Sequence, residues 1–413
     1  MKLILNFKLF ICLCVICLLP SFLFVALSLS SLTPGLVVAA MIVLVFNAKY
    51  LTSYKVKLSD LCIYFTICLI ILIASLFKLL ALNIYKPAFS LFAIFLIFLS
   101  IIAFSEFLKN IPLLVILNTV YVFLLILIFI GWVKLFATPE LLNYGLHSKA
   151  VFPFSEESHY ALILGQLSIF YVLCNNSNKN YLIILNDLIL SLIFPSLLLI
   201  VFAMLMIFSV IVIKGNNVAR IIINISLALF SISLLLLMID TNYFLTRLII
   251  VDTNNLTTLV FLQGWELAYL NLIATNGIGL GFQSLGGSQT IYGYFSDLIS
   301  KITENNIIFN ASDGGFLVAK IIAEFGFVGI IIILIFIGKL LYLVAEIKKY
   351  NKTKSVIIEN NVFIKCAIFL GLLPEMFLRG YGYFSPGLFL FLSFYIYSSK
   401  SNSRARSEII KCA

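Results

Sequence analysis

The chain has 413 residues, of which 63% are hydrophobic and only 11% are Asp, Glu, Lys or Arg. Soluble domains are about 45–50% apolar and about 25% charged, so this composition excludes an ordinary soluble protein. The mean hydropathy is +1.17, and apolar runs recur from end to end. Because a helix that crosses a bilayer needs about 20 apolar residues, the sequence predicts a membrane protein with many spans.

The formal net charge is +10, from 27 basic and 17 acidic residues. The basic residues lie in short segments between apolar runs, so we expect them to orient the chain in the bilayer and not to bind nucleic acid. The eight cysteines lie within apolar runs or near basic segments, without metal-site spacing. We interpret them as small hydrophobic residues and expect neither a disulfide nor a zinc site: Cys12, Cys14, Cys17, Cys62, Cys68, Cys174, Cys366 and Cys412.

Apolar runs and helix-breaking residues predict an all-α integral membrane protein with about twelve transmembrane helices. The first apolar run is too long for a signal peptide and is interpreted as an uncleaved span. The run 182–213 is too long for one span and carries Pro195 near its middle, so it is divided there into two short helices. The other predicted spans are 9–29, 33–48, 59–81, 88–107, 111–135, 158–174, 218–239, 315–341, 361–378 and 384–398.

The charges support this arrangement when both termini are placed in the cytoplasm. The cytoplasmic segments then carry 19 of the 27 basic residues but 6 of the 17 acidic ones, as the positive-inside rule requires. A single helix over 182–213 would place Lys214 and Arg220 outside. We therefore expect one polytopic domain over 1–398 and a cytoplasmic tail over 399–413.

Two segments fall on the outer face in this topology. One is the loop 136–157, and the other is the 75-residue loop 240–314 between spans nine and ten. Connections this long are usually functional or separately folded. They direct the search for a site to the outer face.

Three ionisable residues begin the span that follows the large loop. Lys320 and Glu324 lie seven and eleven residues after Asp313, so on a helix all three share one narrow stripe. An ionisable group this deep in a membrane usually faces a polar cavity. Lys320 and Glu324 could instead neutralise each other as an i, i+4 pair. Gly326 and Gly329 have the spacing of closely packed membrane helices.

The large loop offers further candidates. Arg247 could hold a lipid-linked diphosphate bidentately or anchor the chain at the interface. Gln263, Trp265 and Glu266 combine ring, amide and carboxylate groups that suit a sugar, although an interfacial amphipathic helix has the same pattern. The Gly-rich stretch 277–287, which contains Gln283, predicts a closely packed turn.

Two more groups lie at predicted outer helix ends. His159 follows two glutamates and is either half of an acid/base pair or a residue of a capped helix start. Glu375 and Arg379 are four residues apart, near Tyr383. They either pair with each other or present an outward carboxylate and guanidinium to a ligand.

Five segments resemble elements of the enterobacterial O-antigen polymerases, the Wzy family, in the same order along the chain. The segment 310–326 resembles the helix after that family's large periplasmic loop, and Gly279-Leu-Gly-Phe-Gln-Ser-Leu-Gly286 is similar to its Gly-rich stretch. Leu262-Gln-Gly-Trp-Glu266, Phe154-Ser-Glu-Glu-Ser-His159 and Arg379-Gly-Tyr-Gly-Tyr-Phe384 resemble three other elements.

The resemblance implies a metal-independent glycosyltransferase of the bacterial inner membrane that needs no cofactor. It would join undecaprenyl-diphosphate-linked oligosaccharides at the periplasmic face, among membrane lipids and beside a chain-length regulator protein. Arg247 and Arg379 would stabilise the departing diphosphate, and Glu266, Asp313, Glu324 or His159 would be the general base. The implied substrate-binding residues are Gln263, Trp265, Gln283, Lys320, Glu375 and Tyr383.

Three other functions stay open. A flippase or other transporter would be expected to show related halves and discontinuous helices, and the sequence shows no repeat. An O-antigen ligase would resemble the same superfamily, but Gly315 stands where that branch often carries a histidine. A purely structural membrane subunit gives no reason for the stripe of three ionisable residues.

Overall fold

The computed structural model describes residues 2–53, 85–134, 136, 143–146, 149–194, 196–214, 255–303, 310–353 and 360–412. Within these ranges the regular structure is helical, and the one β-bridge joins Val151 and Phe154. Six of the described helices are long and apolar enough to cross a membrane, or seven if one bent pair is a single span. The chain is therefore an all-α, multi-pass membrane protein.

Ten of the twelve predicted spans overlap described helices, not all of them of membrane length, and the spans 59–81 and 218–239 lie outside the described residues. The last helix continues through most of the predicted tail. The helices are α1 (Lys2–Cys17), α2 (Leu19–Ala26), α3 (Thr33–Asn47), α5 (Lys86–Lys109), α6 (Leu113–Lys134), α7 (Glu157–Cys174), α8 (Lys179–Ile193), α9 (Leu197–Phe208), α12 (Leu256–Ala274), α13 (Tyr294–Ile302), α14 (Leu317–Thr353), α15 (Asn360–Phe377) and α16 (Pro386–Cys412). Short 3₁₀ turns cover Ala48–Ser53 and Tyr144–Leu146, and a π-helical turn covers Ser209–Ile213.

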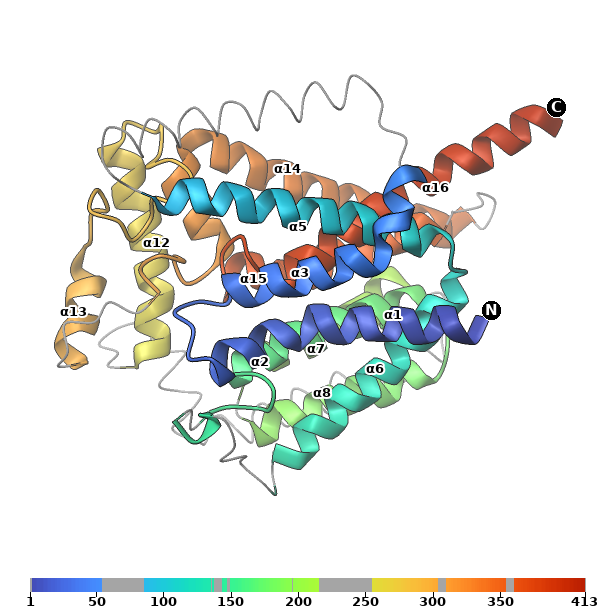
Figure 1. The fold of residues 1–413 in the computed structure, drawn as a ribbon, viewed down its shortest axis with the longest axis horizontal. Coiled ribbons are helices and arrows are strands. Elements are labelled where there is room, and N and C mark those ends of the chain that lie inside the picture. The colour runs from blue at the N-terminus through green and yellow to red at the C-terminus, as the bar shows by residue number, and fades with distance from the viewer. Residues whose placement is uncertain are drawn as a thin grey trace.

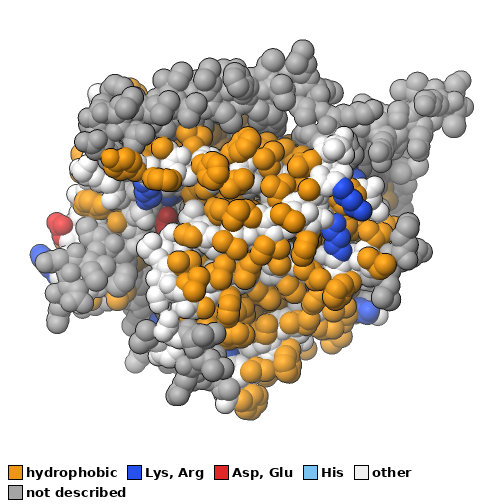
Figure 2. All heavy atoms as spheres, in the orientation of Figure 1, with side chains coloured by type: hydrophobic (Ala, Val, Ile, Leu, Met, Phe, Trp, Pro, Cys, Tyr) orange, Lys and Arg blue, Asp and Glu red, His pale blue; other side chains and the backbone are white. Residues whose placement is uncertain are grey.

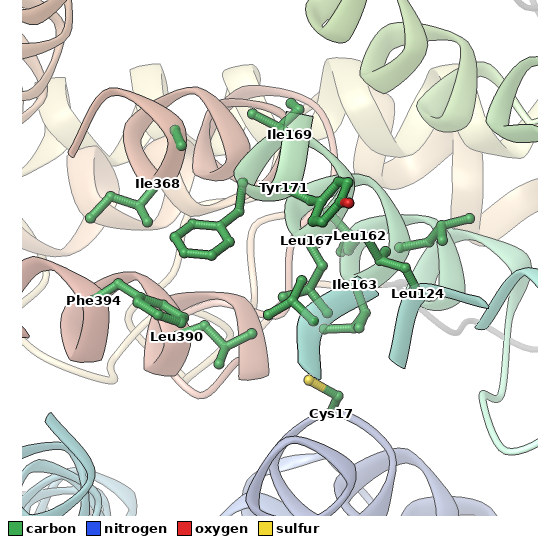
Figure 3. Packing of buried hydrophobic residues seen from close by; sticks show 14 of the residues in the cluster. Cys17, Leu124, Leu162, Ile163, Leu167, Ile169, Tyr171, Ile368, Leu390 and Phe394 are labelled. Carbon is green, nitrogen blue, oxygen red and sulfur yellow. The ribbon is translucent and has the colours of Figure 1, made fainter. Parts of the chain in front are cut away.

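The long helices run roughly side by side, and both chain termini lie at the same end of the bundle (Figure 1). Helix α7 lies at its centre, where every residue from His159 to Leu173 is buried. The ring of Phe170 on α7 lies 4.5 Å from that of Phe394 on α16, centre to centre, and Leu167 of α7 and Ile368 of α15 belong to the same buried cluster (Figure 3). Apolar side chains also cover much of the described surface seen in Figure 2, as a membrane-embedded bundle requires.

The predicted division of the run 182–213 into two short helices is confirmed, although Pro195 itself lies outside the described residues. Helix α8 ends at Ile193 and α9 begins at Leu197, where the Ser196 hydroxyl accepts a hydrogen bond from the Leu199 amide. Proline cannot donate the amide hydrogen that a continuous helix would need there. The two helices then pack against each other.

The predicted span 315–341 is not one regular helix. Gly314 and Gly315 have φ of +66° and +76°, so the helix begins only at Leu317. It is broken again at Gly326, where φ is +58° and ψ is −132°. These are conformations that glycine adopts readily and other residues rarely do. Asp313 therefore precedes the helix, and Glu324 lies only about 10 Å along it.

The Gly-rich turn after α12 fills the break in α14. The amides of Leu280 and Gly281 donate to the carbonyl oxygens of Ala323 and Glu324, at 2.9 and 2.7 Å, and the Phe327 amide donates to Gly277 O at 2.8 Å. A broken helix leaves such groups without partners, which is costly inside a membrane. The prediction of a closely packed turn is confirmed. The close approach at Gly326 is to this turn rather than to a second helix.

The predicted loop 240–314 contains helical structure in its described part. Helix α12 is itself long and apolar enough to cross a membrane. In Figure 1, however, it lies across the end of the bundle opposite the termini, steeply inclined to the long helices. The expected count of twelve spans around one outer loop is thus not confirmed, and the interfacial-helix alternative for residues 263–266 gains support.

We predict that Gly279→Ala lowers the stability of the protein by about 2–5 kcal/mol. Gly279 has φ of +87°, and a Cβ there would lie 2.5 Å from Glu324 O and 2.6 Å from Gly326 N. The apparent melting temperature of the detergent-purified protein measures the effect. Gly338→Ala is the matched control, because nothing lies within 4 Å of its Cβ position and alanine favours the helix. Equal melting temperatures for the two variants would contradict the role of the turn.

Candidate functional site

The buried ammonium of Lys320 joins three segments that are distant in sequence. Lys320 is 1% exposed. Its Nζ donates to Ser312 O at 2.8 Å, to Asp313 Oδ1 at 3.3 Å and to Gln283 Oε1 at 3.4 Å. It also lies 5.1 Å from the centre of the Tyr383 ring. We call Lys320, Asp313, Gln283, Glu324 and Tyr383 the lysine cluster.

The carboxylate of Glu324 stabilises the Gly-rich turn by accepting hydrogen bonds from it. Its Oε2 accepts from the Gln283 amide at 2.9 Å and its Oε1 from the Leu285 amide at 3.1 Å. The carboxylate is 1% exposed and also interacts with Lys320 and Tyr383. Both oxygens are therefore used inside the protein, which makes Glu324 a poor candidate for a general base.

The predicted stripe of three ionisable residues does come together, but not on one helix face. Asp313 reaches Lys320 from the loop before α14, and its side chain remains 40% exposed. The exposed Lys86, at the start of α5, interacts electrostatically with Lys320, Asp313 and Glu324. The solvent-accessible carboxylate of Asp313 and the exposed ammonium of Lys86 therefore lie at the edge of the lysine cluster.

A second group of charges lies on the other side of the loop between α15 and α16. Arg379 Nη2 donates to Glu156 Oε2 at 3.1 Å, and the Ser158 hydroxyl donates to the same oxygen at 2.9 Å. Burial raises the pKa of Glu156, but the nearby His159 and Arg379 and these hydrogen bonds outweigh it and lower the pKa from 4.5 to about 2. The pair is a stable ion pair at neutral pH.

His159 belongs to the same group. Its Nδ1 lies 2.8 Å from the Ser155 hydroxyl, and its ring lies 4.2 Å from the Tyr381 ring, centre to centre. Burial, together with the nearby Glu375 and Glu156, raises the pKa of Tyr381 well above its ordinary value, so this phenol stays protonated. We call Arg379, Glu156, His159 and Tyr381 the arginine cluster. His159 interacts with Glu156, whereas the N-cap residue of α7 makes no side-chain cap hydrogen bond, and an acid/base role for His159 stays a prediction.

The segment 379–383 connects the two clusters. Tyr381 faces His159, whereas Tyr383 stacks on Phe282 at 5.7 Å. The Gly380 amide donates to Gly315 O at 3.0 Å. A Cβ on Gly382 would lie 3.2 Å from Lys320 Nζ and 3.3 Å from Asp313 Oδ1. Glycine at this position lets the backbone lie directly on the Lys320–Asp313 pair.

Of the two alternatives for Glu375 and Arg379, the structure excludes the one in which they pair with each other. Helix α15 ends at Phe377, so Arg379 is not one helical turn beyond Glu375 and instead pairs with Glu156. Glu375 is turned into the bundle and is 2% exposed. It is not placed to contact a substrate outside the bundle.

The three candidates on α12 have structural contacts. Gln263 is 1% exposed, and its Nε2 donates to the Ser296 hydroxyl at 3.2 Å. Glu266 Oε2 accepts from the Phe295 amide at 3.0 Å and thereby caps the start of α13. Trp265 is 39% exposed beside Phe316, so it alone keeps an open ring face for a sugar.

Arg247 lies outside the described residues. Lys86 is the candidate that sequence reasoning missed. Its signal is the Lys86-Pro87 step at a predicted outer helix end, where proline favours the first turn of a helix. Nothing local to that step shows that Lys86 approaches residues 313–324.

Among the residues that the structure describes, no three His, Cys, Asp or Glu side chains are grouped so that they could hold a metal ion. No family model matches the chain, and no curated protein or solved structure matches it either. The candidate site therefore rests on its own geometry.

We predict that the stabilising effect of Glu156 disappears only at strongly acidic pH. Its pKa is lowered on folding, so its contribution is complete above about pH 4.5 and is lost as the pH falls toward about 2. The difference in apparent melting temperature between wild type and Glu156→Gln should be constant from pH 7 to 5 and shrink below pH 4.5. A difference that already vanishes at pH 6 would contradict the ion pair.

We predict that Lys320→Met lowers stability by about 3 kcal/mol, because it leaves buried acceptors without their donor. Lys339→Met is the matched control on the same helix, where the lysine also lies about 5 Å from a tyrosine ring. Thermal unfolding of both purified variants measures the difference. Equal losses would show that Lys320 does not hold the three segments together.

Proposed function

We propose that the protein polymerises lipid-linked oligosaccharide repeat units at the outer face of the bacterial inner membrane. The observation that carries this proposal is the pair of adjoining charged clusters at the end of the bundle away from both termini. The positive-inside bias of the sequence favours placing that end outside. The ordered resemblance of residues 154–384 to the O-antigen polymerases agrees with it, and that family makes a chain-length regulator an expected partner.

Three cations could meet the diphosphate of the carrier lipid. Arg379 is 25% exposed beside a 46% exposed Glu156, and Lys86 is exposed at the edge of the lysine cluster. A guanidinium can bind two phosphate oxygens at once. Arg247 is the third cation that we propose for this role. These cations would stabilise the charge that develops on the leaving group.

Asp313 is the best candidate for the general base. Of its acidic rivals, Glu324 has both oxygens bound to backbone amides, and Glu266 caps α13. Asp313 has one oxygen on Lys320 and an open side chain. Lys320 would then act by positioning this carboxylate.

The proposed step is a glycosyl transfer. A hydroxyl oxygen of the incoming repeat unit forms a bond to the anomeric carbon of the growing chain. The bond from that carbon to the diphosphate oxygen breaks, and its electron pair leaves with undecaprenyl diphosphate. The hydroxyl proton passes to the Asp313 carboxylate. Positioning of two large substrates would supply much of the rate.

One observation favours a transporter as the second candidate. Discontinuous helices mark the substrate sites of many transporters, and α14 is broken at Gly326. Here, however, the Gly-rich turn binds amide and carbonyl groups on both sides of the break. We therefore interpret the break as a structural contact that positions Glu324. We prefer the polymerase to the transporter for this reason. An O-antigen ligase stays the third candidate.

We predict that Arg379→Ala removes the long-chain lipopolysaccharide ladder but leaves the band with a single repeat unit. Loss of one charge-stabilising group typically costs about 10²–10³-fold in rate. The assay is the lipopolysaccharide banding pattern of cells that depend on this chain. Loss of the single-repeat band as well would indicate a ligase or a transporter.

Lys134→Ala is the matched control, since Lys134 forms the neighbouring ion pair with Glu157 at 2.5 Å and has no proposed contact with substrate. It should keep the ladder. The exchanged variant Glu156→Arg/Arg379→Glu separates folding from function, because it restores the ion pair but moves the guanidinium. A full ladder from Arg379→Ala at normal membrane levels would contradict the proposal.

We also predict that Asp313→Asn abolishes the ladder while the protein keeps its normal melting temperature to within a few degrees. General base catalysis contributes about 10²–10⁴-fold, and the asparagine amide oxygen can still accept the hydrogen bond from Lys320 Nζ. Glu266→Gln should lower the melting temperature more and the polymer length less. The opposite pattern would assign the base to Glu266.

A further inference from the structure

Glu375 is a buried carboxyl group at the junction of α7, α15 and α16. It is 2% exposed, and no described residue donates a hydrogen bond to its Oε1. Within the described ranges it takes part in no salt bridge. Among the described residues, the Ser385 hydroxyl is the one side chain that forms a hydrogen bond with this carboxyl group. A carboxylate ion in this position would be poorly compensated.

Gln166 of α7 faces the same group with an acceptor. Its Nε2 donates to Gly387 O at 3.0 Å, and this hydrogen bond fixes the orientation of the amide. The Oε1 atom must then point the other way. A Cβ on Gly387 would lie 2.1 Å from Glu375 Oε2 and 2.8 Å from Gln166 Oε1, so both oxygens lie close to Gly387.

An ionised Glu375 would place its negative charge close to the Gln166 amide oxygen, which is also an acceptor, and would leave its Oε1 without a donor among the described residues. One proton on the carboxyl group removes this conflict, because the acid can donate to the amide oxygen and carries no net charge. We infer that Glu375 is a proton-binding site, in which the protonated carboxyl group donates a hydrogen bond to Gln166 and thereby joins α15 to α7 beside α16.

The bound proton affects the arginine cluster, because one member of that cluster, Tyr381, interacts with Glu375. Tyr381 interacts with Glu375, Glu156 and Arg379, and its ring contacts His159. A neutral Glu375 leaves Glu156 as the carboxylate that balances Arg379. An ionised Glu375 would add a second negative charge behind the guanidinium and weaken its attraction for any anion. The site thus keeps the outer cluster suited to anionic ligands, whichever reaction takes place there.

Infrared difference spectroscopy of the purified protein tests this directly. A protonated carboxyl group has a carbonyl stretch well separated from the bands of a carboxylate. The spectrum of wild type minus Glu375→Gln at pH 7 should contain the acid band and lack carboxylate bands. Wild type minus Glu324→Gln is the matched control, because Glu324 is equally buried but accepts two backbone hydrogen bonds. It should show carboxylate bands.

Gln166→Leu provides a second measurement in a protein that keeps Glu375. Loss of the amide acceptor should shift the acid band to higher frequency without removing it. Carboxylate bands in the Glu375 difference spectrum at pH 7, or an acid band that does not respond to Gln166→Leu, would overturn the inference. Neither result depends on the polymerase proposal, which the lipopolysaccharide ladder tests separately.

Discussion

The need to give hydrogen-bond partners to backbone groups within the bilayer determines the arrangement of the candidate site. Helix α14 is broken at Gly326, and a membrane supplies no water to the groups released there. The Gly-rich turn 277–281 supplies the partners instead. Because that turn follows α12, the same contact holds α12 against the end of the bundle. The Glu324 carboxylate of the lysine cluster is held by backbone amides that follow this turn, those of Gln283 and Leu285.

Charge placement follows from the same constraint. Lys320 and Glu324 are each 1% exposed, and each is surrounded by groups of complementary charge or polarity. Arg379, Glu156, Asp313 and Lys86 lie farther out and keep open surface. The buried charges therefore hold segments together, whereas the outer ones can meet a ligand. Figure 2 shows a small group of acidic and basic side chains at this end, set in a largely apolar surface.

Much of the helical pattern could be predicted from the sequence, because apolar runs and prolines act locally. The break at Pro195 is an example. The sequence also predicts that residues 313, 320 and 324 lie close together, on one face of a helix. They do lie close together, but Gly314 and Gly315 place Asp313 in the loop before that helix. The pairing of Arg379 with Glu156 and the approach of Lys86 could not be predicted, since they join segments far apart in the chain. Helix α12 was missed as a helix of membrane length because its polar residues, Gln263 and Glu266, resemble loop residues until their partners on α13 are known.

The most direct test of the central claim is chain growth in a purified system. The protein would be reconstituted into vesicles with a synthetic undecaprenyl-diphosphate-linked repeat unit as its only substrate. The account predicts products of increasing repeat number, with one undecaprenyl diphosphate released for each bond formed and no nucleotide sugar present. Movement of unchanged repeat units across the vesicle membrane without any chain growth would contradict it.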